Sequence, residues 1–187
     1  GLVCHRSSSN VYGQTLLASI IENHGAEAAK AWAAGVVANF ARDPEGGDTD
    51  QLRGIVSGQC EISVANTYYF ARALRSDVKG LSADIDGIGW IFPAQDAEGA
   101  HMNLSGGGVA AHAPNKDHAI AFLEYLASDQ AQQYFSAGND EFPAVPGVVL
   151  SESVAKLGEF RADTVNLSAV AKNLPEAQKI FNEVGWK

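Results

Sequence analysis

Short apolar runs alternate with helical patterns through the first half of the chain. Residues 2–5 and 60–65 have the composition of short strands, whereas residues 11–24 and 48–56 carry helical signals. The first helical segment has apolar residues at helical spacing and is followed by Gly25, a common helix stop. Strands that alternate with helices in this way are typical of an α/β layer with a largely parallel sheet. We therefore expect an α/β fold.

The rest of the chain predicts further helices and extended segments. Asn115 is a good helix cap, and Pro175 suits the first turn of a helix. Expected helices cover residues 26–34, 67–74, 115–127, 130–137, 151–157, 166–172 and 175–184, and expected extended segments cover 36–40, 88–93 and 102–109. No run approaches the roughly 20 apolar residues of a membrane-spanning helix.

Composition limits the possible partners. The chain has 13 Lys and Arg against 22 Asp and Glu, which gives a formal net charge of −9. Such a surface repels phosphate backbones and attracts cations, so we expect no nucleic acid partner, DNA included. The opening residues 1–6 lack the basic, apolar and small-residue order of a signal peptide, which predicts a mature or truncated chain.

Motifs for catalysis are not found. The Gly-rich residues 105–108 lack the lysine of a phosphate-binding loop, and residues 84–87 lack the later ligands of a calcium loop. The five histidines show no zinc-site spacing, and no nucleophile elbow or Ser-His-Asp order is present. An α/β hydrolase or transferase would need a nucleophile–base pair, so we expect no enzyme.

Three tyrosines occupy unusual positions. Tyr68 and Tyr69 follow a predicted strand at the start of a helix, and Tyr12 lies just inside another helix start. Aromatic packing is the commoner role for such residues. The alternative is phenolate ligation of a hard trivalent cation such as ferric iron. A phenol of pKa about 10 ionises at neutral pH only in a strong positive field, which a metal ion and helix amino termini supply.

Two cysteines lie beside predicted strands. If the strands that contain Cys4 and Cys60 are neighbours in a sheet, a disulfide between them is geometrically possible. Such a bridge would indicate an oxidising compartment, and two buried thiols are the alternative. We predict the bridge, which would tie the first strand to the strand before Tyr68.

Several strings closely resemble the ferric-ion-binding proteins of iron ABC importers, above all the tyrosine-rich cyanobacterial and marine-bacterial branch. The strings are residues 4–12, 39–51, 66–69, 101–106, 112–116 and 184–186. The resemblance spans essentially the whole chain. It implies a type II periplasmic-binding-protein fold, Fe(III) held in an interlobe cleft, a periplasmic location and delivery of the iron to an ABC transporter permease.

The resemblance also implies a ligand set. In that branch a pair of tyrosines and a third, upstream tyrosine bind the iron, which places the ligands on Tyr68, Tyr69 and Tyr12. Because Tyr12 is present, we expect no obligatory synergistic anion. We expect Arg6 and residues 7–10 to donate hydrogen bonds to the phenolates.

The chain departs from the family in length. Family members are much longer, and their N-terminal lobe contributes a further His or Tyr ligand. The resemblance assigns residues 1–98 and 150–187 to the C-terminal lobe, and residues 99–149 to a hinge crossing and a segment of the N-terminal lobe. We therefore expect a fragment with an exposed apolar patch, to be covered by the missing N-terminal lobe or a second chain.

Lobe closure completes such sites, so a fragment should bind iron weakly. Two alternatives remain open at this stage. One is a type II solute-binding protein for another small ligand, such as a polyamine, thiosulfate or an organic anion. The other is a fragment without binding activity.

Overall fold

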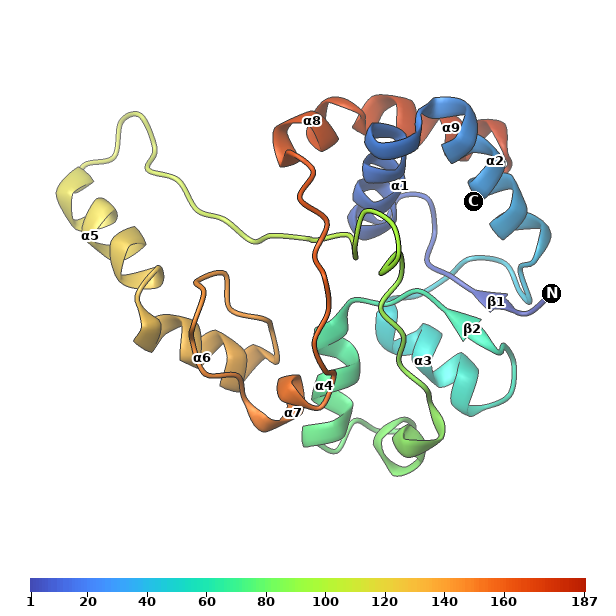
Figure 1. The fold of residues 1–187 in the computed structure, drawn as a ribbon, viewed down its shortest axis with the longest axis horizontal. Coiled ribbons are helices and arrows are strands. Elements are labelled where there is room, and N and C mark those ends of the chain that lie inside the picture. The colour runs from blue at the N-terminus through green and yellow to red at the C-terminus, as the bar shows by residue number, and fades with distance from the viewer.

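The structure, a computed structural model, describes residues 1–187 and is rich in helices (Figure 1). None of the helices combines the length and the apolar character needed to traverse a bilayer. In chain order the elements are β1 (Val3–Cys4), α1 (Val11–His24), α2 (Ala26–Ala38), α3 (Asp48–Val56), β2 (Ile62–Ser63), α4 (Thr67–Arg75), the 3₁₀ helix η1 (Ser82–Gly87), α5 (Lys116–Leu126), α6 (Asp129–Asn139), α7 (Glu152–Ala155), α8 (Leu167–Lys172) and α9 (Leu174–Glu183).

A very small parallel sheet lies near the N-terminus. β1 pairs with β2 in parallel, with Val3 opposite Ile62, and Phe40 forms one parallel bridge to Val3. The predicted parallel pairing is confirmed, but the paired strands are two residues long rather than spanning residues 2–5 and 60–65. The helices, rather than the sheet, therefore supply most of the packed surface.

A disulfide joins Cys4 of β1 to Cys60 just before β2, as predicted. The bridge packs directly on Gly54 of α3. A Cβ atom at Gly54 would lie 2.8 Å from the Cys60 Sγ and 3.0 Å from the Cys4 Sγ, which is too close for any side chain. The absence of a side chain at Gly54 thus allows α3 to pack against the bridged strands.

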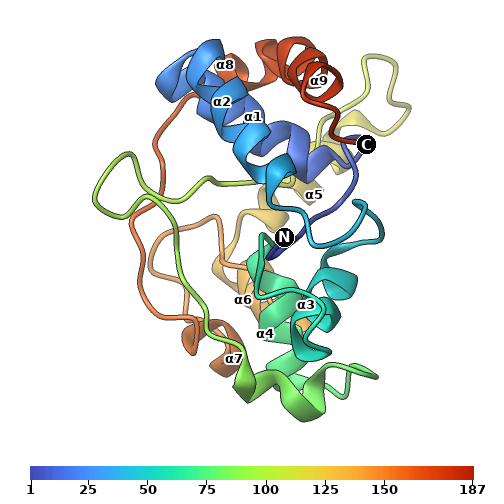
Figure 2. The ribbon, with the colours of Figure 1, turned by 90° about the vertical axis from the view of Figure 1, so that its right-hand side faces the viewer.

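Two apolar clusters form the core. The first joins α1, α2, α8 and α9 and consists of Leu17, Ala18, Ala29, Ala33, Val170, Ala177, Ile180, Phe181 and Trp186. The second joins α3, α4, η1 and α7 and consists of Leu52, Phe70, Ala71, Ala73, Leu81, Ile85, Val154 and Leu157. Figure 2 shows the first helix group above and the second below. The starts of α1 and α4 therefore belong to different clusters.

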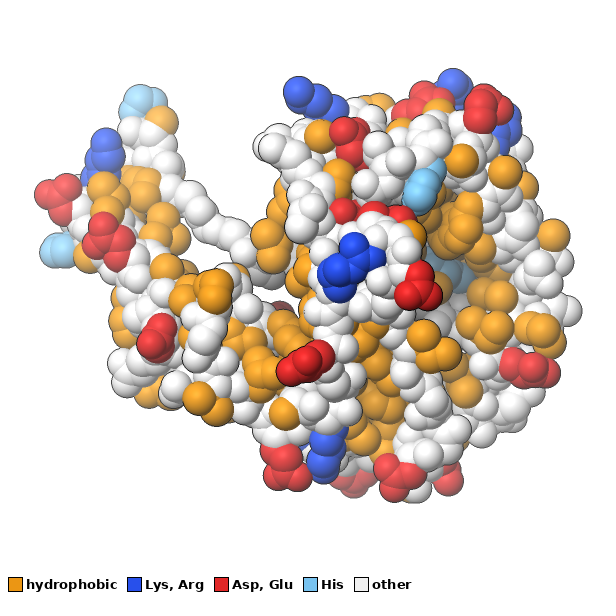
Figure 3. All heavy atoms as spheres, in the orientation of Figure 1, with side chains coloured by type: hydrophobic (Ala, Val, Ile, Leu, Met, Phe, Trp, Pro, Cys, Tyr) orange, Lys and Arg blue, Asp and Glu red, His pale blue; other side chains and the backbone are white.

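Residues 101–115 leave this body without regular secondary structure and lead to α5 and α6, which form an arm on one side (Figure 1). No residue of α5 is buried. Phe122 of α5 is 59% exposed and Tyr134 of α6 is 62% exposed, and hydrophobic side chains cover much of the arm in Figure 3. The expected exposed apolar patch within residues 99–149 is present.

Most predicted helices are confirmed, and α1 and α3 have the predicted bounds. The extended segment predicted at residues 36–40 is wrong, because α2 continues to Ala38. The β-branched residues Val36 and Val37 favoured a strand by propensity. They instead continue the helical stripe of Ala29 and Ala33 and pack against the first cluster.

The strand predicted at residues 88–93 is also wrong, because these residues pair with no other strand. Their side chains do alternate. Ile88, Trp90 and Phe92 pack against the second cluster, whereas Ile91 is exposed. The segment is therefore buried on one side, but a strand also needs a hydrogen-bonded neighbour.

The disulfide should contribute substantially to stability. The two cysteines are 56 residues apart in the sequence. Because the bridge lowers the entropy of the unfolded chain, it contributes about 4 kcal/mol to the free energy of unfolding. We expect the double variant Cys4→Ala with Cys60→Ala to lose a free energy of unfolding of this order in a urea titration. A reductant should destabilise the wild type and leave the double variant unchanged. Equal stability of the two proteins would contradict the prediction.

His5 is a buried histidine beside Trp186 of the first cluster. Its ring meets the Trp186 ring edge-on at 4.6 Å, and its Nδ1 lies 3.1 Å from the Arg6 carbonyl oxygen. Burial, and secondarily the positive charge of Arg6, lower the pKa of His5 to about 4 from 6.5. Because protonation is easier in the unfolded chain, acid favours unfolding.

Stability should therefore fall as the pH drops from about 6.5 towards 4, by about 2 kcal/mol at pH near 4.5 from this group alone. The variant His5→Phe keeps an aromatic ring and removes the titration. We expect its free energy of unfolding, measured in urea at pH 7 and pH 4.5, to depend less on pH by this amount. An equally steep pH dependence in the variant would show that His5 titrates normally.

Candidate metal centre

The three predicted tyrosines lie at the amino-terminal ends of two helices. Tyr12 is the second residue of α1, and its backbone N–H donates to the capping Asn10 Oδ1 at 3.0 Å. Tyr68 and Tyr69 are the second and third residues of α4. Both helix starts present the positive end of a helix dipole. This environment favours negative charge on nearby oxygens.

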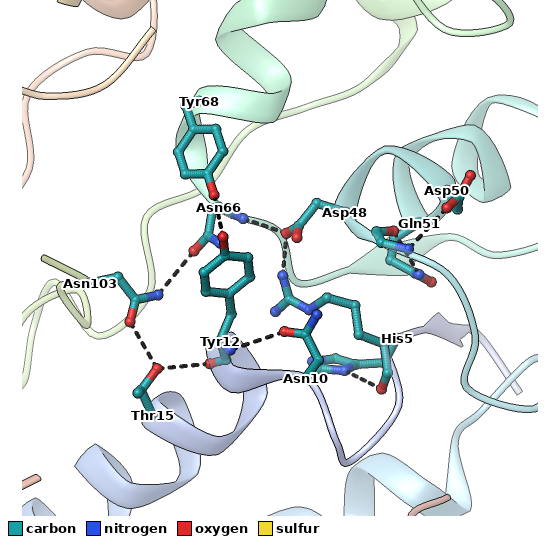
Figure 4. Close-up of polar contacts among 12 residues, drawn as sticks. His5, Asn10, Tyr12, Thr15, Asp48, Asp50, Gln51, Asn66, Tyr68 and Asn103 are labelled. Atoms are coloured by element: carbon teal, nitrogen blue, oxygen red, sulfur yellow. Dashed lines mark hydrogen bonds and ion pairs between the residues drawn. The ribbon is translucent and has the colours of Figure 1, made fainter. Parts of the chain in front are cut away.

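The structure brings these tyrosines together, although 56 residues separate Tyr12 from Tyr68. The Tyr68 hydroxyl donates to the Tyr12 hydroxyl at 2.9 Å, and the two rings point toward each other in Figure 4. The rings of Tyr68 and Tyr69 lie with their centroids 4.4 Å apart. Three phenol oxygens from two helices can therefore face one small volume.

The surroundings of Tyr68 and Tyr69 oppose ionisation of their phenols. Burial, followed by the hydrogen bond with Tyr12, raises the pKa of Tyr68 far above its ordinary value. Burial also raises the pKa of Tyr69, and the negative charge of Asp48 adds to the shift. A cation close to these two oxygens would therefore favour their ionisation.

Two guanidinium groups flank the tyrosine rings. The Arg6 Cζ lies 5.6 Å from the centre of the Tyr12 ring. The Arg72 Cζ lies 5.9 Å and 5.8 Å from the centres of the Tyr68 and Tyr69 rings. These positive charges would stabilise phenolates once they form. The sequence analysis missed Arg72, although its place one turn after Tyr68 on the same helix was a usable signal.

A buried ion pair supports the cluster. Arg6 Nη1 donates to Asp48 Oδ1, and the two residues are only 2% and 1% exposed. The same carboxylate oxygen accepts from the backbone N–H of Asn66 at 2.8 Å. The start of α3 is thereby tied to the residue that precedes α4. From the sequence, Asp48 was expected only at the start of the helix over residues 48–56.

The residues expected to donate hydrogen bonds to the phenolates, Arg6 and residues 7–10, have other partners in the structure. Arg6 donates to Asp48, and Asn10 caps α1. Ser7 and Ser9 hydrogen-bond to each other, and the Ser8 carbonyl accepts from Gln14. Residues 7–10 therefore shape the loop before Tyr12 and make no hydrogen bond to a phenol oxygen.

No cluster of three or more His, Cys, Asp and Glu side chains is arranged to hold a metal ion. The tyrosine cluster is a candidate of another kind, because it is built from phenols. Its ligand atoms are oxygens, which suit hard cations, and the nearby helix starts and guanidinium groups suit a ligand set that becomes negative on binding. A trivalent cation would be matched in charge by three phenolates.

Known proteins resemble the chain over its full length. It is 45% identical over 187 residues to iron uptake protein A1 of Synechocystis sp. and 43% identical over 189 residues to iron uptake protein A2 of the same organism. These matches cover all of the chain but 52% and 55% of the relatives. The chain thus spans about half the length of the curated relatives it matches.

Solved structures agree with the fold. A Trichodesmium protein described as IdiA or FutA, in complex with iron and citrate, superposes with a TM-score of 0.95 at 47% identity. A ferric binding protein from Campylobacter jejuni superposes with a TM-score of 0.93 at 40% identity. Each match covers the whole chain and 59% of the solved chain. The chain therefore has the type II periplasmic-binding-protein fold over the part that it spans.

A family model described as bacterial extracellular solute-binding protein matches residues 6–162, a range that contains all three tyrosines. Since this range is most of the sequence, the chain belongs to the family of bacterial extracellular solute-binding proteins.

Proposed function

We propose that the chain binds ferric iron through the phenolates of Tyr12, Tyr68 and Tyr69. As part of an extracytoplasmic solute-binding protein, it would deliver the iron to the permease of an ABC importer. The observation that carries the proposal is the convergence of the three tyrosines from two helix starts, with a 2.9 Å contact between the Tyr12 and Tyr68 hydroxyls. The relatives named for iron uptake and ferric binding support the choice of cargo.

Charge balance explains why a trivalent cation suits these residues. Three phenolates carry three negative charges, which Fe(III) neutralises. Each phenol must lose its proton on binding, because the pKa values of Tyr68 and Tyr69 are raised in the free chain. The guanidinium groups of Arg6 and Arg72 beside the rings favour that loss. The residues present therefore select a strong Lewis acid over weakly polarising cations.

We also propose that the chain forms parts of two lobes. Residues 1–98 and 150–187 would make one lobe, and residues 99–149 would cross the hinge and pack within the other. The absence of buried residues in α5 and the exposed Phe122 support this division, since such a face is normally covered. An N-terminal lobe or a second chain would then cover the arm and complete the coordination of the iron.

A periplasmic location follows from the same proposal. The Cys4–Cys60 disulfide suits an oxidising compartment. One relative from Serratia marcescens, 24% identical, is called an Fe(3+)-binding periplasmic protein. The net charge of −9 also suits a carrier of cations rather than of nucleic acid. We propose binding and delivery without catalytic turnover.

The ligand assignment predicts a visible spectrum. Adding ferric nitrilotriacetate to the chain should produce a broad tyrosinate-to-iron charge-transfer band. Tyr12→Phe, Tyr68→Phe and Tyr69→Phe should each weaken the band and raise the dissociation constant about tenfold or more. Tyr134→Phe, a control on the exposed arm, should leave the titration unchanged. A band of equal intensity in all four variants would remove the assignment, and no band in the wild type would remove the proposed function.

Proton release provides an independent test. Each phenol that becomes a ligand loses one proton, so iron affinity should fall as the pH falls. Calorimetry in buffers of different ionisation enthalpy counts the protons released per iron. We expect Tyr68→Phe to release about one proton fewer than the wild type under the same conditions. Because the chelator contributes equally to both, an identical count would mean that Tyr68 is not a ligand.

A further inference from the structure

Asn103 is the residue of the segment leading to α5 that enters the hydrogen bonds around the tyrosine pair. Figure 4 shows its side chain between the start of α1 and the start of α4. The amide accepts a hydrogen bond at one end and donates one at the other. Neither bond is part of secondary structure, and the two partners belong to the two different helix starts that carry the tyrosines.

On the α1 side, Asn103 is joined to Thr15. The Thr15 Oγ1 contacts the Tyr12 carbonyl oxygen at 3.2 Å and the Asn103 Oδ1 at 2.8 Å. Thr15 follows Tyr12 by three residues, so it lies on the same side of the helix. The position of the Asn103 amide is therefore fixed relative to the first turn of α1, which carries the Tyr12 ring.

On the α4 side, Asn103 is joined to Asn66. The Asn103 Nδ2 donates to the Asn66 Oδ1 at 3.1 Å. The Asn66 carbonyl oxygen in turn accepts from the backbone N–H of Tyr69 at 3.2 Å. The Asn66 backbone N–H is held by the buried Asp48. Asn66 is thus held in place by Asp48. Asn103 is hydrogen-bonded to Asn66, the residue that caps the tyrosine-bearing helix α4.

These contacts form a closed circuit. It runs from Tyr12 through Thr15, Asn103, Asn66 and Asp48 to Arg6, whose guanidinium lies beside the Tyr12 ring. Asn103 is the member of the circuit that comes from residues 101–115, and its side chain joins Thr15 of α1 to Asn66, which precedes α4. Without it, the circuit would be open between Thr15 and Asn66.

We propose that Asn103 is a positioning residue that sets the separation of the Tyr12 and Tyr68 hydroxyls by bridging Thr15 and Asn66. Its effect on iron rests on the proposed function, whereas its effect on tyrosine geometry does not. A planar amide with one acceptor end and one donor end suits this bridge. The hydrogen bonds of Asn103 are exposed to water, so each contributes only modestly to stability. We therefore expect loss of the bridge to change the geometry of the tyrosines rather than the fold.

Matched variants test the bridge from both ends. Asn103→Leu keeps similar bulk without hydrogen bonds, and Thr15→Val keeps the branched shape without the hydroxyl. Thr15→Ser restores the hydroxyl and should restore wild-type behaviour. Ser105→Ala lies on the same segment, at a residue with no hydrogen bond from its side chain, and is the control. Far-ultraviolet circular dichroism checks that every variant is folded.

Two readouts are measured on each variant. The first is the nuclear Overhauser effect between the ring protons of Tyr12 and Tyr68 in the iron-free chain. The second is the charge-transfer maximum and the dissociation constant with ferric nitrilotriacetate. We expect Asn103→Leu and Thr15→Val to weaken the Overhauser effect, shift the band and weaken binding about three- to tenfold. The double variant should be no worse than either single variant, because both break the same bridge.

An Overhauser effect as strong in Asn103→Leu and Thr15→Val as in Ser105→Ala would overturn the proposal. So would failure of Thr15→Ser to restore it. If the wild type gives no tyrosine-dependent band, the proposed function fails, and the iron-free measurement decides the role of Asn103 by itself. If the band is present but identical in all variants, the proposed function stands and Asn103 has no positioning role.

Discussion

The buried ion pair of Arg6 and Asp48 is the interaction on which the rest of the site depends. Two ions are costly to remove from water, and the Arg6 Nε and the Asp48 Oδ2 have no hydrogen-bond partner to offset that cost. Asp48 accepts from the Asn66 backbone, and the Arg6 carbonyl oxygen accepts from the Trp186 indole N–H at 3.0 Å. The pair thus joins the loop after β1 to the starts of α3 and α4 and to the C-terminus. Its contribution is to geometry, since a hydrophobic pair could stabilise a core equally well.

The Arg6 side chain of this ion pair also lies beside the Tyr12 ring and so contributes to the electrostatics of the tyrosine cluster. The helix starts and the two guanidinium groups lie beside the tyrosine rings, while burial raises the pKa values of Tyr68 and Tyr69. Under the proposed function, Tyr68 and Tyr69 stay protonated until a cation displaces their protons. Such a site would favour a strongly polarising ion, because binding must offset the cost of deprotonation.

The arm formed by α5 and α6 differs from the rest of the structure in how little of α5 is buried. The α5 helix has no buried residue, whereas the C-terminal end of α6 is held to the body by the buried carboxylate of Asp140, which accepts from Arg75 at 2.8 Å and 2.9 Å. An arm held at its base and exposed along its length fits a chain that spans about half of its relatives. The three tyrosines lie on α1 and α4 of the body, so their cluster forms without contacts from the arm.

Sequence alone determined the local elements whose signals are local: the bounds of α1 from its cap and Gly25, the start of α4, and the three tyrosines as candidate ligands. It misassigned residues 36–40 and 88–93, because their structure depends on helix packing and on a missing partner strand. Only the tertiary structure decided that Asp48 pairs with Arg6 and that Asn103 bridges Thr15 and Asn66. Those contacts join residues 42, 88 and 37 positions apart, and no local pattern records them, since polar side chains in loops can pair with many partners until packing fixes one.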